Sequence, residues 1–281
     1  MTLKPIYIVT DSTVDLSKEV VEQYNIHVVP LNIQIDDEAY TDGVNIKPDE
    51  FLVLMRDSKE LPKSSQPAVG VFKELYDELG ADGAEIISIH MTSGMSGTFQ
   101  SAETAAGMTN SKVTVIDSKF ISHGLSFQVV EAAEMAQKGH SAAEILARIE
   151  EVRQTTTLFL VVDKLDNLVK GGRIGKGRAL IGSILNIKPV FALKDGVLSS
   201  LSQMRGHRQA VKYLYKMFTE QTSGKIIKKV GIAHANGLAI AEPLKQLLEE
   251  FGVKDVPLTI TTPIVSTHTG EGAVGFMFYT E

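Results

Sequence analysis

The sequence predicts an α/β protein in which an N-terminal three-layer domain built on a parallel sheet precedes a C-terminal α+β domain. Short apolar runs rich in β-branched residues, at 6–9, 86–89 and 113–116, alternate with segments of helical pattern, and this alternation is typical of parallel sheets. In the second half, Asp195-Gly196 lies between two apolar runs and indicates a hairpin. A chain of 281 residues is long enough for two domains.

Local signals place the elements of the first half. Asp15 is a plausible cap for a first helix, and Pro48 and Pro67 each fit a first helical turn. The predicted strands are residues 6–9, 28–35, a short return strand near 39–40, 86–89 and 113–116, and the predicted helices begin near Leu16, Pro48, Pro67 and Thr98 and cover 125–137 and 142–154. We expect the N-terminal domain to cover residues 1–155, with a small hairpin insertion near 31–62.

The second half, residues 156–281, is expected to form the C-terminal domain. It contains a glycine-rich segment at residues 170–177, which precedes a predicted helix that ends near Leu185. The other predicted strands are 158–162, 190–193, 197–201, 229–233, 258–264 and 274–279, and the other predicted helices are 163–169, 207–222 and 238–251.

Composition excludes several classes of function. A formal net charge of −6 and a pI near 5.7 argue against a nucleic-acid partner. The chain has no cysteine, so it has no disulfide and no thiolate metal site, and its seven histidines do not cluster at metal-ligand spacings. The first apolar run is too short for a signal peptide, and no run approaches the roughly eighteen apolar residues of a membrane span. We therefore expect a cytoplasmic protein without a metal.

Residues 85–104 change character three times, from a buried strand through a loop of small residues to a helix that begins at Thr98. A helix start of this kind directs backbone N–H groups and the positive end of the helix dipole at one point, which attracts an anion. Ser93 and Ser96 are either helix caps or part of an anion site, and the presence of a third hydroxyl, Thr92, favours the anion site. A serine nucleophile is less favoured, because Thr98 occupies the second glycine position of the nucleophile elbow around Ser96.

Two glycine-rich segments resemble nucleotide motifs but lack the required context. Residues 270–275 fit a dinucleotide fingerprint, yet they open a strand and not a helix. Residues 170–177 lack the Walker spacing, and Gly177 stands where Ser or Thr would bind magnesium. His268 lies among hydroxyl residues and is either an ordinary residue or a donor to a ligand anion. The sequence shows no nucleotide site of its own.

Several motifs together resemble the DegV family over the whole length of the chain. They are Val9-Thr10-Asp11-Ser12-Thr13, Ser64-Ser65-Gln66-Pro67, the segment from Thr92 to Thr98, Lys170-Gly171-Gly172-Arg173-Ile174 and the segment from His268 to Ala273. The resemblance implies a two-domain α/β protein that buries one long-chain fatty acid between its domains. It also implies a binding subunit of bacterial fatty acid kinase, which is not an enzyme by itself, has no cofactor and presents the carboxylate to an ATP-dependent kinase subunit.

The resemblance also assigns individual residues. Ser93, the Gly94 backbone and Ser64 would hold the carboxylate, and His268 would support them. Arg173 and Arg205 would lie on the face that meets the kinase, outside the pocket. In this arrangement the carboxylate has only neutral partners and so stays nucleophilic. Burial of about fifteen carbons of the tail contributes on the order of 12 kcal/mol to the binding free energy before any costs. The alternatives are a lipid carrier or sensor without a kinase, and a hydrolase or phosphotransferase that uses the serine loop.

Overall fold

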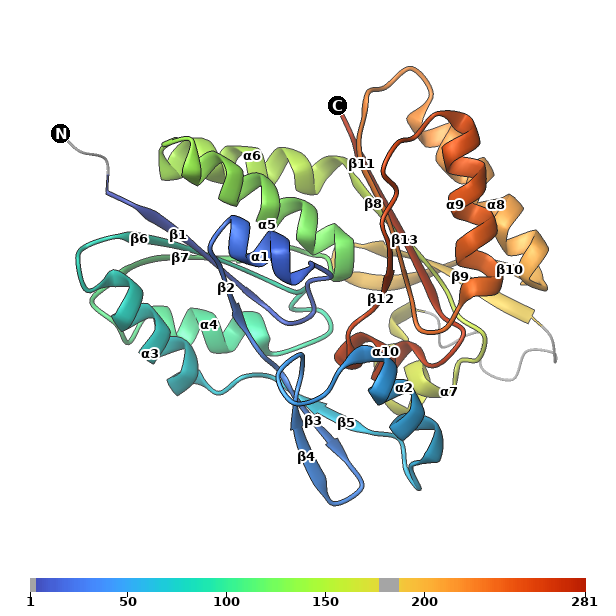
Figure 1. The fold of residues 1–281 in the computed structure, drawn as a ribbon, viewed down its shortest axis with the longest axis horizontal. Helices are drawn as coiled ribbons and strands as arrows, with labels where there is room; N and C mark the ends of the chain where they lie inside the picture. Colours follow the sequence, from blue (N-terminus) through green and yellow to red (C-terminus); the bar gives the residue numbers. More distant parts are fainter. Residues whose placement is uncertain (1–3, 177–186) are drawn as a thin grey trace.

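The computed structural model describes residues 4–176 and 187–281. Its N-terminal half contains a parallel four-stranded sheet in the order β2-β1-β6-β7, with helices on both faces (Figure 1). The strands are β1 (Ile6–Asp11), β2 (Ile26–Val29), β6 (Glu85–His90) and β7 (Lys112–Asp117). Helices α1 (Lys18–Gln23), α5 (Ser122–Gln137) and α6 (Ala142–Thr155) cover one face, and α3 (Val69–Gly80) and α4 (Thr98–Ala106) cover the other.

The strands of this sheet are apolar on both faces, as the continuous runs in the sequence predict. In β6, Ile87 and Ile89 pack in the core under α5, whereas Ile86 packs with α3 and α4. In β1, Ile8 and Val9 divide in the same way. The predicted three-layer arrangement is therefore confirmed.

A small antiparallel sheet projects from this domain at the predicted insertion. It consists of β3 (Asn32–Ile35), β4 (Glu38–Thr41) and β5 (Lys63–Ser65), and α2 (Pro48–Asp57) lies between β4 and β5 in the chain. The single extended segment predicted at residues 28–35 is two strands, because the chain leaves the parallel sheet at Pro30, which has no N–H to continue the ladder.

The C-terminal half forms a six-stranded mixed sheet in the order β10-β9-β8-β13-β11-β12. The strands are β8 (Thr156–Val161), β9 (Ile187–Lys194), β10 (Val197–Arg205), β11 (Ile227–His234), β12 (Leu258–Ile260) and β13 (Val274–Thr280), and the helices are α7 (Asp166–Lys170), α8 (His207–Thr222), α9 (Leu238–Phe251) and α10 (Pro263–Thr269). Helices α8 and α9 cover the outer face (Figure 1). The inner face packs against the N-terminal half.

Alternation along β13 explains why this sheet is buried on both sides. Phe276 and Phe278 pack under α8 and α9, whereas Met277 and Tyr279 face α5 and α6. All strands of the parallel sheet precede residue 156 and all strands of the mixed sheet follow it. We therefore propose a domain boundary between Thr155 and Thr156. No helix in residues 4–176 and 187–281 is long and apolar enough to cross a membrane.

Two predictions about helix starts and one about the end of a strand were wrong. The cap of α1 is Ser17, whose Oγ accepts from the Val20 N–H, whereas Asp15 is buried. Helix α3 begins at Val69 rather than Pro67, and the extended Ala68 is its cap. The strand predicted at residues 258–264 ends at Ile260, and Pro263 begins α10, where its missing N–H has no intrahelical partner to lose. The helix predicted to end near Leu185 lies outside the described residues.

Candidate functional site

A cavity with a largely apolar lining lies between the two sheets, beyond the carboxyl ends of the parallel strands, where the α/β topology predicts a ligand. The loops after β1, β6 and β7 contribute Thr13, Met91 and Ile121, and the inner face of the mixed sheet contributes Leu160 and Met277. The space enclosed by the lining atoms is about 900 Å³, part of it open to solvent at the mouth. The part of this space that the centre of a water-sized sphere can occupy is about 70 Å³.

Helix α10 forms one wall of this cavity. Ile264, Val265, His268 and Thr269 line it, and their spacing of three or four residues places them on one face of the helix. Thr261, just before the helix, lines the same wall. The wall is therefore apolar in the middle and polar at each end.

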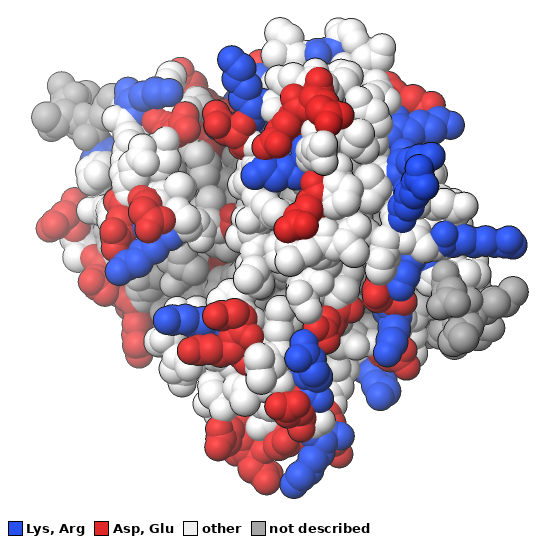
Figure 2. Space-filling model, turned by 45° about the vertical axis from the view of Figure 1, so that its right-hand side comes forward, with Lys and Arg blue, Asp and Glu red and all other residues white. Residues whose placement is uncertain are grey.

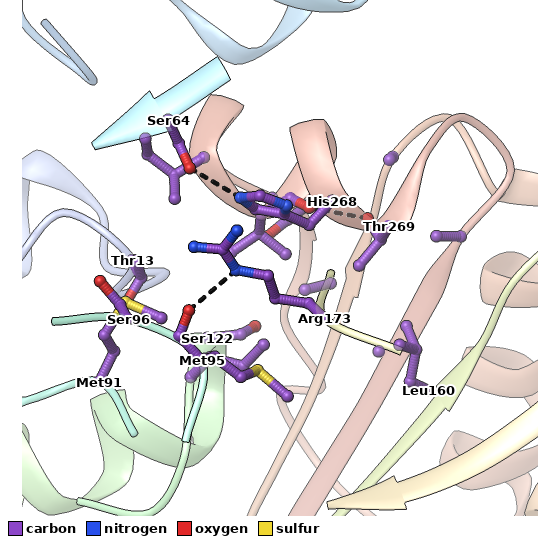
Figure 3. Close-up of a pocket in the computed structure, with 18 of the residues that line it drawn as sticks. Thr13, Ser64, Met91, Met95, Ser96, Ser122, Leu160, Arg173, His268 and Thr269 are labelled. Carbon is purple, nitrogen blue, oxygen red and sulfur yellow. Dashed lines mark hydrogen bonds between the residues drawn. The ribbon is translucent and has the colours of Figure 1, made fainter. Parts of the chain in front are cut away.

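Ser64 and His268 meet at one end of the wall, although they are 204 positions apart in the chain (Figure 3). The Ser64 Oγ lies 2.7 Å from the His268 Nε2. Burial, and secondly the positive charge of Arg173, lower the pKa of His268 to about 4. The imidazole is therefore neutral near pH 7 and can share one hydrogen with the Ser64 hydroxyl.

Gly171 leaves room for the imidazole. A Cβ at this position would lie 2.5 Å from the His268 Nδ1, a separation that carbon and nitrogen do not reach without one of them moving. The Nδ1 is buried and has no hydrogen-bond partner among the described residues. Close packing, and not a hydrogen bond, thus fixes the ring on this side.

Arg173 lines the cavity beside His268 (Figure 3), so the prediction that it lies outside the pocket was wrong. The cause is the end of α7. The Gly172 N–H donates to the Val169 carbonyl, the Arg173 N–H donates to the Leu168 carbonyl, and Gly172 has a φ of +73°, which is the pattern of a Schellman motif. This motif turns the chain back towards the cavity.

The guanidinium of Arg173 is held by backbone carbonyls. Its Nε donates to the Met95 carbonyl at 2.9 Å, and its Nη1 donates to the Gly171 carbonyl at 2.6 Å. Burial lowers the pKa of Arg173, and no carboxylate of the described residues forms an ion pair with it. The cavity mouth therefore contains a positive charge that the expected neutral pocket lacks.

Ser93 and Gly94 do not line the cavity. Ser93 is exposed, and its Oγ donates to the Asp117 carboxylate. A Cβ at Gly94 would lie 2.5 Å from the Gly196 carbonyl oxygen, so this glycine permits contact with the β9–β10 hairpin. Met95 and Ser96 of the same loop do line the cavity. The cap of α4 is Gly97, and the Ser96 Oγ accepts from the Thr98 N–H at 3.3 Å.

Arg205 is exposed at the end of β10 and does not line the cavity. Its backbone N–H donates to the Gln209 Oε1 at 2.8 Å. The structure thus separates the two arginines that the sequence analysis grouped together, one in the cavity and one on the surface.

Comparison with known proteins agrees with this architecture. A family model described as that of the DegV family matches residues 5–281. The chain belongs to the DegV family. A DegV domain-containing protein of Staphylococcus aureus (strain MRSA252) is 44% identical over 271 residues, which cover 96% of this chain and 97% of that protein.

Solved structures of DegV family members have the same fold. The structure of a DegV family protein from Thermus thermophilus, described for its fatty acid binding, matches with a TM-score of 0.93 and 31% identity over 99% of this chain and 100% of that one. DegV from Bacillus subtilis, a fatty acid binding protein, matches with a TM-score of 0.88 and 32% identity over 99% of this chain and 100% of that one.

A second polar group of the site was not predicted. Thr13, Ser122, His234 and Thr261 are buried and line the cavity of this DegV protein. Their side chains come from four separate places in the chain, and only Thr13 belongs to one of the motifs on which the resemblance to the family rests. Only the fold brings them together.

Proposed function

We propose that this DegV protein binds one long-chain fatty acid, with the tail in the apolar part of the cavity and the carboxylate near Ser64 and His268. The observation that carries the proposal is a cavity with an apolar middle, at one end of which lie the Arg173 guanidinium and the Ser64 hydroxyl. The fatty acid binding of the related structures supports the same ligand class.

The tail supplies the affinity. Burial of about fifteen methylene groups contributes on the order of 12 kcal/mol before the costs of association and of ordering the chain. Leu158, Leu160, Leu168 and Met277 are buried side chains that line the cavity and give this tail an apolar environment.

The head group needs hydrogen-bond donors, because an unpaired carboxylate in such a site would cost several kcal/mol. In the tautomer with a hydrogen on Nε2, His268 donates to Ser64, and the Ser64 hydroxyl is then free to donate to the carboxylate. Arg173 supplies the opposite charge beside this pair. We therefore add Arg173 to Ser64 and His268 as a proposed head-group residue.

Ser93 and Gly94 remain proposed head-group residues only if their loop moves. The Ser93 hydroxyl would have to exchange its Asp117 acceptor for the ligand. Ser96, from the same loop, already lines the cavity. A comparison of Ser93→Ala with Ser96→Ala in lipid retention decides which serine serves the carboxylate.

We further propose that the protein presents the carboxylate to an ATP-dependent fatty acid kinase subunit and is not an enzyme by itself. Figure 2 shows both signs of charge interspersed over one face rather than one broad basic surface. A partner would therefore be oriented by individual cations, and Arg205 is the exposed candidate. A lipid carrier or sensor without a kinase is the alternative within the same binding function.

A hydrolase is supported less well. The Ser64–His268 pair has the spacing of a nucleophile and its base, but the His268 Nδ1 has no carboxylate partner among the described residues to orient the ring. The Ser93 hydroxyl contacts Asp117 and no histidine.

The first experiment is denaturing extraction and mass spectrometry of the protein purified from a bacterial host. We expect about one fatty acid per chain, and extraction of no lipid would refute the binding proposal. Arg173→Ala should reduce the bound fraction, and Arg205→Ala should leave it in place because Arg205 is outside the cavity.

The second experiment adds the kinase subunit and ATP to the loaded protein. Arg205→Ala should lower acyl-phosphate formation at unchanged lipid content. Equal rates for the variant and the native protein would remove Arg205 from the docking surface. ATP turnover or ester hydrolysis by the isolated protein would instead support an enzyme.

A further inference from the structure

Three hydroxyl groups line the cavity at the end of α10 opposite His268. Thr13, Ser122 and Thr261 are 0%, 4% and 3% exposed. Thr261 is followed by α10, and His268 lies in the last turn of that helix. At a rise of ~1.5 Å per residue, the wall separates the two polar ends by about 10 Å.

The hydrogen of each of these hydroxyls is committed to a buried aspartate. Ser122 and Thr261 both donate to the Asp15 Oδ2, Thr261 at 3.0 Å. Thr13 donates to the Asp11 Oδ1 at 2.6 Å. A carboxylate can only accept, so the remaining capacity of all three oxygens is that of an acceptor. This end of the cavity can therefore accept a hydrogen bond from a ligand group but cannot donate one through these hydroxyls.

His234 supplies a complementary group. Its ring lines the cavity with only 6% exposure, and its Nδ1 has no hydrogen-bond partner among the described residues. Its carbonyl accepts from the Thr261 N–H at 2.9 Å, which places the two residues side by side. A ring N–H of His234 can donate to a ligand oxygen whose own hydrogen goes to Thr261 or Ser122.

An anion does not suit this end, because Asp15 and Asp11 stand directly behind the hydroxyls. A keto oxygen has no hydrogen to donate. An alcohol both donates and accepts, so it matches all the groups present.

We propose that these residues form a subsite for a hydroxyl group carried along the acyl chain, so that the protein accepts hydroxylated long-chain fatty acids. This proposal rests on the proposed function, since it concerns the tail of the same ligand. The separation of about 10 Å along α10 places the hydroxyl in the middle of the chain, neither next to the carboxylate nor at the methyl end.

The test measures the affinities of delipidated protein for stearic acid and for a panel of monohydroxystearic acids with the hydroxyl at successive carbons. We expect one mid-chain isomer to bind at least as tightly as stearic acid. Isomers with the hydroxyl elsewhere should bind roughly tenfold or more weakly, because the hydroxyl is buried without a partner. The keto analogue of the best isomer should also bind more weakly than the alcohol.

The variants test the residues. Thr261→Val removes one hydroxyl at nearly constant shape and should lower the affinity ratio of the best hydroxy acid to stearic acid about tenfold. Ser122→Ala should lower the same ratio. Thr267→Val is the matched control, because Thr267 is buried in α10, donates to the Pro263 carbonyl and does not line the cavity. Its ratio should equal that of the native protein.

The outcomes separate the two proposals. Tight binding of stearic acid with uniformly weaker binding of every hydroxy isomer would overturn the subsite and keep the fatty-acid site. A ratio unchanged in both Thr261→Val and Ser122→Ala would also overturn the subsite. Absence of binding for every acid would overturn the proposed function itself.

Discussion

Asp15 provides a quantitative test of the buried polar cluster. Its side chain is only 5% exposed, it accepts from Ser122 and Thr261, and its Oδ1 has no partner among the described residues. Burial outweighs these hydrogen bonds and raises the pKa of Asp15 from 3.8 to about 6. The nearby Asp42 carboxyl has a pKa raised to about 7, mainly by burial and also by the charge of Asp15.

The sign of the pH effect follows from linkage. A carboxyl whose pKa is higher in the folded protein than in the unfolded chain binds its proton more tightly when folded. Its contribution to stability is thus most favourable below the unfolded pKa and is lost as the pH rises to the folded pKa. For Asp15 the loss extends from about pH 3.8 to about pH 6. At ~1.4 kcal/mol per pKa unit, it amounts to about 3 kcal/mol.

Asp15→Asn removes this titration and retains an oxygen that can accept from the two hydroxyls. We expect the free energy of unfolding of the variant, relative to the native protein, to rise by about 2 to 3 kcal/mol between about pH 4 and pH 8. Urea unfolding of delipidated protein, followed by circular dichroism, measures it without a contribution from ligand binding.

The control for the loss of one negative charge is Asp82→Asn, which changes an exposed residue between α3 and β6. The asparagine N–H₂ group can lack a hydrogen-bond acceptor and so destabilise the variant by the same amount at every pH. Such a cost would shift the whole plot of unfolding free energy against pH for Asp15→Asn but would not change its slope. Parallel pH profiles for Asp15→Asn and the native protein would refute the argument.

Three further changes have defined expectations. Gly171→Ala should displace the imidazole of His268, because the new Cβ would lie 2.5 Å from the Nδ1. Calorimetry should then show a fatty-acid affinity that is lower by about tenfold or more. Gly70→Ala is the control and should leave the affinity unchanged, because no atom lies within 4 Å of its Cβ. Arg173→Lys keeps the positive charge but lacks the planar guanidinium, whose Nε and Nη1 donate to two carbonyls. The fraction of this variant that retains lipid should therefore fall between that of the native protein and that of Arg173→Ala. Arg148→Met should lower the free energy of unfolding by about 1 to 3 kcal/mol. The side chain of Arg148 is 19% exposed and pairs with Glu131 at 3.0 Å and with Glu281 at 2.6 Å. A change below about 0.5 kcal/mol in urea titrations would contradict this expectation.

The sequence predicts those parts of the fold that have a local cause. Apolar periodicity located the strands of both sheets, and Asp195-Gly196 located the β9–β10 turn, where both residues have a positive φ. Pro263 was misjudged because the apolar residues before and after it read as one strand, whereas Thr262 and Pro263 begin α10. The predicted strand at residues 258–264 stopped short of His268, so that residue was singled out without being assigned to a helix, although it lies in the last turn of α10.

The cavity was only partly predictable, because its residues meet through tertiary structure. Ser64 and His268 were assigned from family motifs, and they lie 2.7 Å apart. No sequence signal joins Asp15 to Ser122 and Thr261, which are 107 and 246 positions away. Arg173 was misplaced for a different reason: the direction of its side chain depends on the left-handed conformation of Gly172, which the glycine permits but does not require.

Arg173 lines the cavity and also contacts the N-terminal half of the chain. Its guanidinium donates to the Met95 carbonyl, and the neighbouring Thr92 hydroxyl donates to the Gly196 carbonyl at 2.9 Å. Both contacts join the loop between β6 and α4 to the C-terminal half of the chain, at the mouth of the cavity. A carboxylate that binds Arg173 would therefore contact the same guanidinium that joins the β6–α4 loop to the C-terminal half.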